Sequence, residues 1–249
     1  MSTRTRAVVL PLIGFALVLA IWQGTVSLYH LQLVVLPPPW TVAKTLVALL
    51  GTAAFWHDVG VSLYEFVVGY AIGLVLGILL GTLMGEWRAF RQASTPVVES
   101  LRFVVPFAWI PLTILWFGTS YVGKIALVAY AVFFVMVVST ARAVVRVDPV
   151  LSRVGRVIGM GTWQLAWRVH LRAAAPTIAS AARAAAAVGW IAVVAAEYIG
   201  ASAGLGLMIT NAASSLATPT VIAGMVVIGL IGAAVSALVG WLSRARLDY

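Results

Sequence analysis

Long apolar runs separated by short charged segments are the feature that most restricts the fold of this chain of 249 residues. Hydrophobic residues make up 63% of the chain and charged residues 9%, whereas a soluble globular domain is about half apolar and a quarter charged. A helix needs about 20 apolar residues to cross the hydrocarbon core of a bilayer. The sequence therefore predicts an all-α polytopic membrane protein with about six transmembrane helices, at residues 8–29, 59–85, 103–117, 121–141, 176–197 and 219–242.

The third of these runs is the shortest and contains Pro106 and Pro111. Proline breaks the hydrogen-bond ladder of a helix, and neighbouring helices must then satisfy the freed backbone groups. We therefore expect residues 103–117 to form a kinked or partly buried span.

The positions of the basic residues predict the topology. Of the 16 Lys and Arg residues, all but Lys44, Lys124 and Arg183 fall on one side of the six predicted spans. Because Lys and Arg concentrate in cytoplasmic loops, we expect both termini and residues 142–176 to be cytoplasmic, in the cell membrane. The net charge of +9 then reflects topology, and we expect no nucleic acid partner. The first run is too long for a typical signal peptide and is expected to be retained.

We expect three regions in the chain. Residues 1–58 hold the first span, the helix-breaking segment Leu36–Trp40 and a short amphipathic helix at Thr41–Leu50 on the outer surface. Residues 59–242 form the core, and residues 243–249 form a cytoplasmic tail.

The second predicted span carries a glycine at every fourth position, which leaves one helix face without side chains. Such a face allows another backbone to approach closely, within the chain or across a dimer. The residues predicted for this packing seam are Gly69, Gly73, Gly77, Gly81 and Gly85.

Residues 146–176 form a basic loop with two predicted helices. Asp148 can cap the first helix and Pro149 suits its first turn, while Gly159 tolerates the positive φ at which such a helix stops. A second helix follows, Trp163–Ala174, and we expect both to lie parallel to the membrane. From the residues alone the loop is either an amphipathic pair bound to lipid headgroups or a docking element for a soluble partner.

Four segments resemble the permeases of binding-protein-dependent ABC importers, type I, in the branch with nitrate, sulfonate and taurine permeases. These segments, which occur in the same order as in the family, are LPPPWTVAKTL, PFAWIPLTILWFG, VDPVLSRVGRVIGMGTWQLAWRVHL and AAEYIGASAGLG. The loop is similar to the family's EAA-type loop, in which a short helix, a glycine and a second helix insert into the ATPase subunit.

The resemblance implies a type I permease fold with a cytoplasmic coupling helix, and a homodimer that works with two ATPase subunits and an extracytoplasmic solute-binding protein. It implies import of a small, anionic solute similar to sulfonate, nitrate or taurine, by alternating access driven by ATP. The chain itself is expected to be no enzyme and to hold no cofactor, because ATP and Mg would bind the ATPase subunit.

The resemblance also implies which loop residues contact the ATPase. Three residues depart from the family pattern: Arg153 stands at the usual Glu, Gly155 at the following Ala, and Arg172 at the Pro of an LP pair. Glu65 stands where relatives often carry Arg. The reversed charge at Arg153 implies an altered partner surface. The residues expected to couple to the ATPase are Asp148, Arg153, Gly155, Arg156, Gly159, Trp163, Gln164 and Arg168.

Five residues are candidates for the substrate path. Acids near a membrane are costly enough to suggest a function, but Glu65 and Glu197 fall near the predicted outer ends of their spans, where hydration or pairing would also explain them. The aromatic candidates can equally be packing residues, and Arg183 is expected to snorkel to the interface. The candidates are Glu65, Trp116, Trp190, Glu197 and Asn211.

Two other classes of function stay open. An ion-coupled secondary transporter would need ionisable residues near the middle of the membrane, and a membrane-embedded enzyme would need clustered His, Asp or Glu. The sequence has no cysteine, and His30, His57 and His170 are far apart, so we expect no metal site. No pattern of a nucleophile with its base, or of a phosphate-binding loop, is present.

Overall fold

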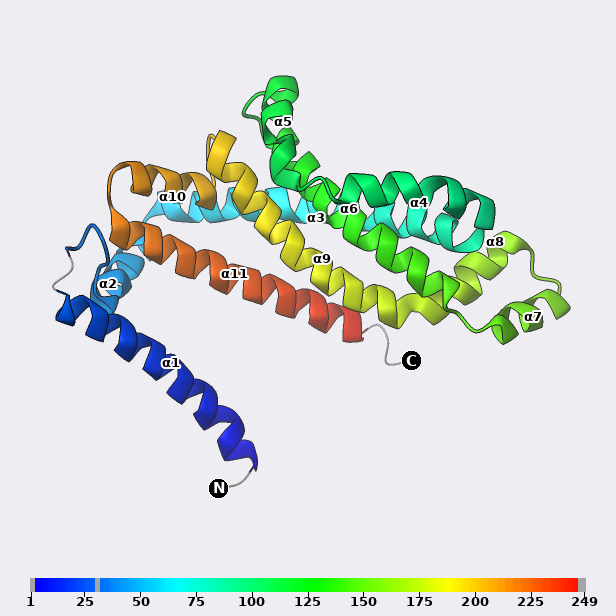
Figure 1. The fold of residues 1–249 in the computed structure, drawn as a ribbon, viewed down its shortest axis with the longest axis horizontal. Coiled ribbons are helices and arrows are strands. Elements are labelled where there is room, and N and C mark those ends of the chain that lie inside the picture. The colour runs from blue at the N-terminus through cyan, green and yellow to red at the C-terminus, as the bar shows by residue number, and fades with distance from the viewer. Residues whose placement is uncertain (1–2, 30–31, 246–249) are drawn as a thin grey trace.

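The computed structural model describes residues 3–29 and 32–245, and within them every regular element is helical. Figure 1 shows the long helices packed as an elongated bundle, while the first helix diverges from it and a short helix projects from its side. The elements are α1 (Thr3–Leu28), α2 (Pro39–Leu50), α3 (Ala53–Glu86), α4 (Arg88–Arg102), the 3-10 turn η1 (Pro106–Trp109), α5 (Ile110–Phe117), α6 (Tyr121–Val145), α7 (Pro149–Val157), α8 (Thr162–Gln164), the π-helical segment η2 (Leu165–His170), α9 (Leu171–Gly200), α10 (Leu205–Ser214) and α11 (Thr218–Ala245).

Within the described residues the structure does not confirm the count of six spans that the sequence predicts. Among the described residues four helices are long and apolar enough to cross a membrane, namely Ala53–Glu86, Tyr121–Val145, Thr162–Ile199 and Thr218–Ser243. A fifth is present if α4 and the helix at Pro106–Phe117 count as one span, and these two are bent by 82° at their junction. In α1, Ile13–Leu28 is a shorter apolar helix.

The predicted third span is therefore only the second half of a broken one. Pro106 lacks the N–H needed to continue α4 and instead occupies the first turn of η1, and Pro111 lies in the first turn of α5. The first half, α4, was not expected as a helix. It is strongly amphipathic, so an apolar run does not reveal it.

The tightest packing in the bundle is between α3 and α6. A Cβ atom added at any of the five seam glycines of α3 would lie 2.5–2.8 Å from the Cβ of an α6 residue. The α6 residues also recur at every fourth position, so two complementary rows meet along the helices. They are Val128, Val132, Met136, Thr140 and Val144.

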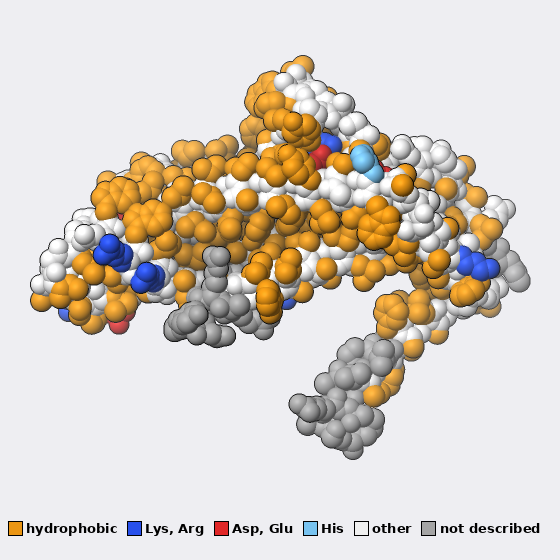
Figure 2. Space-filling view, turned by 180° about the vertical axis from the view of Figure 1, so that it is seen from behind, with side chains coloured by type: hydrophobic (Ala, Val, Ile, Leu, Met, Phe, Trp, Pro, Cys, Tyr) orange, Lys and Arg blue, Asp and Glu red, His pale blue; other side chains and the backbone are white. Residues whose placement is uncertain are grey.

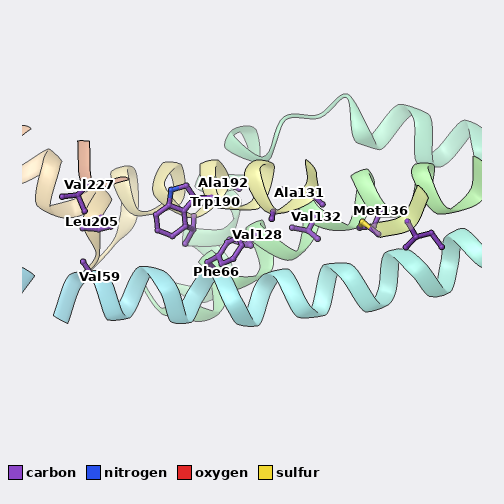
Figure 3. Close-up of a cluster of buried hydrophobic side chains, with 14 of the residues drawn as sticks. Val59, Phe66, Val128, Ala131, Val132, Met136, Trp190, Ala192, Leu205 and Val227 are labelled. Atoms are coloured by element: carbon purple, nitrogen blue, oxygen red, sulfur yellow. The ribbon is translucent and has the colours of Figure 1, made fainter. Parts of the chain in front are cut away.

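A third helix, α9, closes this core. Val128, Val132 and Met136 of α6 are fully buried, and Figure 3 shows them among residues of α3 and α9. Trp190 of α9 packs edge-on against Phe66 of α3, with ring centroids 5.8 Å apart. Outside this core the molecule presents hydrophobic side chains over most of the face in Figure 2, as expected for a surface covered by lipid or by protein.

Candidate functional site

The 146–176 loop begins with the capped helix that the sequence predicts. Asp148 Oδ1 accepts a hydrogen bond from the Val150 N–H at 2.8 Å, and Pro149 occupies the first position of α7. After α7 the backbone of Gly159 has φ +83°, a conformation that glycine adopts without steric cost. Local chemistry therefore produces the helix and its glycine turn.

The second loop helix differs from the prediction. It begins at Thr162, where Gln164 Oε1 accepts a hydrogen bond from the Gly161 N–H at 3.2 Å. It does not end near Ala174, because α8, η2 and α9 run on as one helix over Thr162–Ile199. Pro176 lies inside α9, so the second loop helix is the first part of a long span and not a separate surface helix.

The apolar stripe of α7 has no partner within the described chain. Val157 is 86% exposed and Ile158 is 66% exposed. Val150 and Val154 are also exposed, as are the flanking Arg153 and Arg156. An apolar face of this kind, edged by charge, is typical of a contact surface for another protein or for lipid.

A hydrogen-bonded chain of three side chains ties α7 to the bundle. Ser152 Oγ of α7 lies 2.7 Å from His170 Nε2, and His170 Nδ1 lies 2.5 Å from Glu86 Oε1 at the end of α3. A neutral imidazole satisfies both contacts when Nδ1–H donates to the carboxylate and Nε2 accepts from the hydroxyl. The sequence gives no indication of these hydrogen bonds, since Glu86 and His170 belong to different helices.

Gly155 and Trp163 add apolar contacts at the same junction. A Cβ at Gly155 would lie 2.7 Å from Leu165 Cδ2, so the glycine lets α7 sit close to η2. Trp163 meets Trp87 edge-on, with centroids 5.2 Å apart. All eight residues predicted to couple to an ATPase are exposed except Gly155, which is buried. Asp148 and Gln164 also make hydrogen bonds within the loop.

At the opposite end of the bundle the two acidic candidates are fully buried and paired, so pairing, and not hydration, accompanies their position near the ends of the helices. Glu65 of α3 has an exposed fraction of 0%, and its Oε1 lies 2.6 Å from Nζ of the buried Lys124 of α6. Glu197 of α9, also at 0%, accepts hydrogen bonds from Ser62 Oγ at 2.6 Å and from the Gly206 N–H at 2.8 Å.

These contacts hold the N-terminus of α10 against the bundle. The Gly204 N–H donates to Asp58 Oδ1 at 2.9 Å and the Leu205 N–H to Ser62 Oγ at 3.0 Å. Side chains of α3 and α9 thus accept the hydrogen bonds that the first turn of a helix cannot make internally. Gly204 has φ +122°, and a Cβ there would lie 2.5 Å from Glu197 Oε1, so the glycine is required.

The remaining substrate-path candidates do not converge on one cavity. Trp190, a candidate for the path or for packing, is buried in the core and donates from Nε1 to the Ile228 carbonyl at 3.0 Å. Trp116 is exposed on the projecting α5, and Asn211 is exposed on α10. Arg183 donates from Nε to Ser236 Oγ at 3.4 Å, which ties it to α11. Among the described residues there is no cluster of three or more His, Cys, Asp or Glu that could hold a metal ion.

Known proteins with similar sequences are transport permeases. This chain is 33% identical over 232 residues to the taurine transport system permease protein TauC of Escherichia coli (strain K12), covering 91% of this chain and 84% of TauC. It is 32% identical over 234 residues to the putative aliphatic sulfonates transport permease protein SsuC of Bacillus subtilis (strain 168), covering 94% and 85%.

Solved structures share the fold at lower identity. A bacterial ABC transporter involved in import of the acidic polysaccharide alginate matches with a TM-score of 0.67 at 15% identity, over 82% of this chain and 83% of that one. The MetNI methionine ABC transporter in an inward-facing conformation matches with a TM-score of 0.61 at 18% identity, over 84% and 97%.

The family model described as "Binding-protein-dependent transport system inner membrane component" matches residues 73–247, which is more than half of the chain and includes the 146–176 loop. The chain therefore belongs to this family of multi-pass ABC transporter permeases.

Proposed function

We propose that this chain is the membrane permease of an ATP-driven importer for a small anionic solute of the sulfonate or taurine type. Two copies would work with two ATPase subunits and an extracytoplasmic solute-binding protein, with both termini and the 146–176 loop in the cytoplasm. The solute class is suggested by the names of the relatives, taurine and aliphatic sulfonates transport permeases.

One observation carries the proposal: α7 presents an exposed apolar stripe and is also connected to the bundle by side-chain contacts. The stripe consists of Val150, Val154, Val157 and Ile158. The connection is the series of contacts from Ser152 through His170 to Glu86. A helix that transmits motion from a docked partner needs both the exposed surface and the connection to the bundle, because a docking helix without that connection would move without moving the spans.

In the mechanism that we propose, ATP binding closes the two ATPase subunits and displaces the two docked α7 helices. Each α7 would then move α9, which continues directly from the loop, and α3, which is joined to it through Glu86. The spans would exchange between inward-open and outward-open states, a population shift driven by nucleotide. The exposed Arg153 would face an acidic residue of the cognate ATPase.

The test is assembly of the permease with its ATPase. Val157→Asp places a charge on the most exposed part of the stripe and should abolish co-purification of the ATPase in mild detergent. Val47→Asp is the matched control, because Val47 is 71% exposed on α2 at the other end of the bundle. Equal co-purification of the ATPase with both variants and with the unmodified permease would refute docking at α7.

An ion-coupled secondary carrier is the competing function, because Glu65 and Glu197 are buried carboxylates within the spans. Both carboxylates are already occupied, Glu65 by Lys124 and Glu197 by Ser62 and Gly206. The lone permease in proteoliposomes should therefore show no uptake driven by an ion gradient. Such uptake without ATP would favour the carrier.

A further inference from the structure

Two adjoining cavities lie between α4 and α6, beside the break that separates α4 from η1. The larger has a volume of about 490 Å³ and is lined in part by Arg102, Phe103, Tyr130, Phe134 and Arg142. The smaller has a volume of about 380 Å³, and Val138 and Arg142 line both. These volumes lie within the range of about 300–1,000 Å³ that is typical of small-molecule sites.

The charged residues that line the two cavities are mostly basic. They comprise four arginines and one glutamate, a sum of +4 − 1 = +3. Glu99 Oε2 lies 2.5 Å from Arg102 Nε, but Glu99 Oε1 is 3.8 Å from Arg142 Nη2, beyond hydrogen-bonding distance. The guanidinium of Arg142 thus keeps donors that Glu99 does not satisfy, and its side chain is 63% exposed.

The helix break beside the larger cavity is held by one side chain. The Tyr130 hydroxyl lies 2.6 Å from the Leu101 carbonyl and 3.0 Å from the Val104 carbonyl, where the regular helix stops. Tyr130 in turn packs against Phe134, with ring centroids 4.8 Å apart. Irregular backbone within a span is tolerated where it is buried in protein or lines a water-filled cavity.

The position of Arg102 along the bundle follows from the direction of α4. In Figure 1, α4 lies along α6 and the end of α3 that is near the loop. Its 15 residues rise about 22 Å from Arg88 at that end, so Arg102 lies well inside the length of α3. Arg102 belongs to the α4 half of the candidate broken span, and charged residues within spans often mark ion or substrate paths in membrane proteins.

We propose that the two cavities form a binding vestibule for the anionic head of the transported solute, with Arg102 and Arg142 as its ligands. A sulfonate has three oxygen acceptors and suits the planar fork of a guanidinium. Phe103 and Phe134 would cover the short apolar body of the solute. This inference rests on the proposed function and narrows it to solutes with one oxyanion group and a small hydrocarbon part.

The test measures binding of radiolabelled butanesulfonate to the permease–ATPase complex in phosphatidylcholine nanodiscs, without nucleotide. Arg102→Gln and Arg142→Gln should each weaken binding about ten-fold or more, since each removes a charge-assisted hydrogen bond. Arg142→Lys keeps the charge but loses the fork and should fall between. Arg88→Gln is the matched control, because Arg88 is exposed on the same helix and lines neither cavity.

Each outcome bears on the vestibule separately from the proposed function. Unchanged butanesulfonate binding in both glutamine variants, with the complex intact and its basal ATP hydrolysis normal, would overturn the vestibule. The vestibule would also be overturned if the unmodified complex showed no saturable binding of butanesulfonate although ATP drives its uptake. If the glutamine variants instead bind less phosphatidylglycerol than the unmodified complex does, in nanodiscs that contain this lipid, the arginines bind lipid headgroups and the vestibule is overturned. Failure of the ATPase to assemble would count against the proposed function itself.

Discussion

Glu65 of α3 and Lys124 of α6 form an ion pair in the interior, with Oε1 and Nζ 2.6 Å apart and exposed fractions of 0% and 5%. The pair lies next to the α3–α6 glycine seam, since Gly69 follows Glu65 by one helical turn and meets Val128, one turn after Lys124. Charge pairing and close packing therefore fix the same register between the two helices.

Lys124→Met should destabilise the permease strongly, because it leaves the Glu65 carboxylate buried without its counter-charge. A loss of about 3–5 kcal/mol is typical when one partner of a buried pair is removed. The measurement is the thermal unfolding midpoint of the permease in detergent. The double variant Glu65→Leu with Lys124→Met removes both charges and should recover most of the loss. A double variant as unstable as Lys124→Met would show that lost packing, and not the unpaired charge, dominates.

Gly77→Ala should disturb the seam, because the new Cβ would lie 2.5 Å from Met136 Cβ of α6. Overpacking of this kind costs about 1–3 kcal/mol, and we expect a lower yield of folded permease and a lower unfolding midpoint. Gly60→Ala on the same helix is the control, since its Cβ would meet no atom within 4 Å. Similar midpoints for the two variants would contradict the close approach of α3 and α6.

Glu197→Gln should loosen the start of α10. Ser62 Oγ donates to Oε1 and the Gly206 N–H donates to Oε2, and the amide replaces one of these two oxygens with an NH2 group, so one of the two donors loses its acceptor. An unsatisfied buried donor costs about 1–3 kcal/mol, and hydrogen exchange at residues 204–206 should accelerate. Asn211→Ala, at an exposed position of α10, should leave that exchange unchanged. Unaltered protection in Glu197→Gln would mean that Asp58 and Ser62 suffice.

His170→Ala should uncouple transport from ATP hydrolysis. It removes both the Ser152 contact and the Glu86 contact, so α7 could move without moving α3. We expect the assembled complex to hydrolyse ATP but to import less solute per ATP in proteoliposomes. Ser180→Ala, exposed on α9, is the control. An unchanged ratio of solute to ATP would remove His170 from the mechanical link, even if stability fell.

Gly159→Ala should have the same uncoupled phenotype through the backbone. Gly159 has φ +83°, which disfavours any side chain, whereas Gly161 has φ −71° and equally open surroundings. Gly161→Ala in the same loop is thus the matched control and should transport normally. Transport assays of both variants, with assembly checked by co-purification, separate the effect of the turn from that of a bulkier loop surface. Normal coupling in Gly159→Ala would show that the turn is not needed.

The sequence by itself determined the features that depend on near neighbours along the chain. Apolar runs define the long helices, Asp148 and Pro149 start α7, and Gly159 ends it, because hydrophobic periodicity, capping and φ preferences act within a few residues. The spacing of the α3 glycines likewise predicted a packing seam, and the structure supplied its partner, α6.

Only the tertiary structure decided which distant groups meet. The sequence left open whether Glu65 and Glu197 lie on a substrate path or are hydrated or paired, since nothing near them in the chain reveals Lys124 or Ser62 as partners. The length of the helix through Pro176 and the break before Pro106 also depended on neighbours, because a proline can continue or end a helix according to how surrounding helices satisfy the freed carbonyls. Contacts between helices depend on which faces pack together, and that choice is made by the whole bundle.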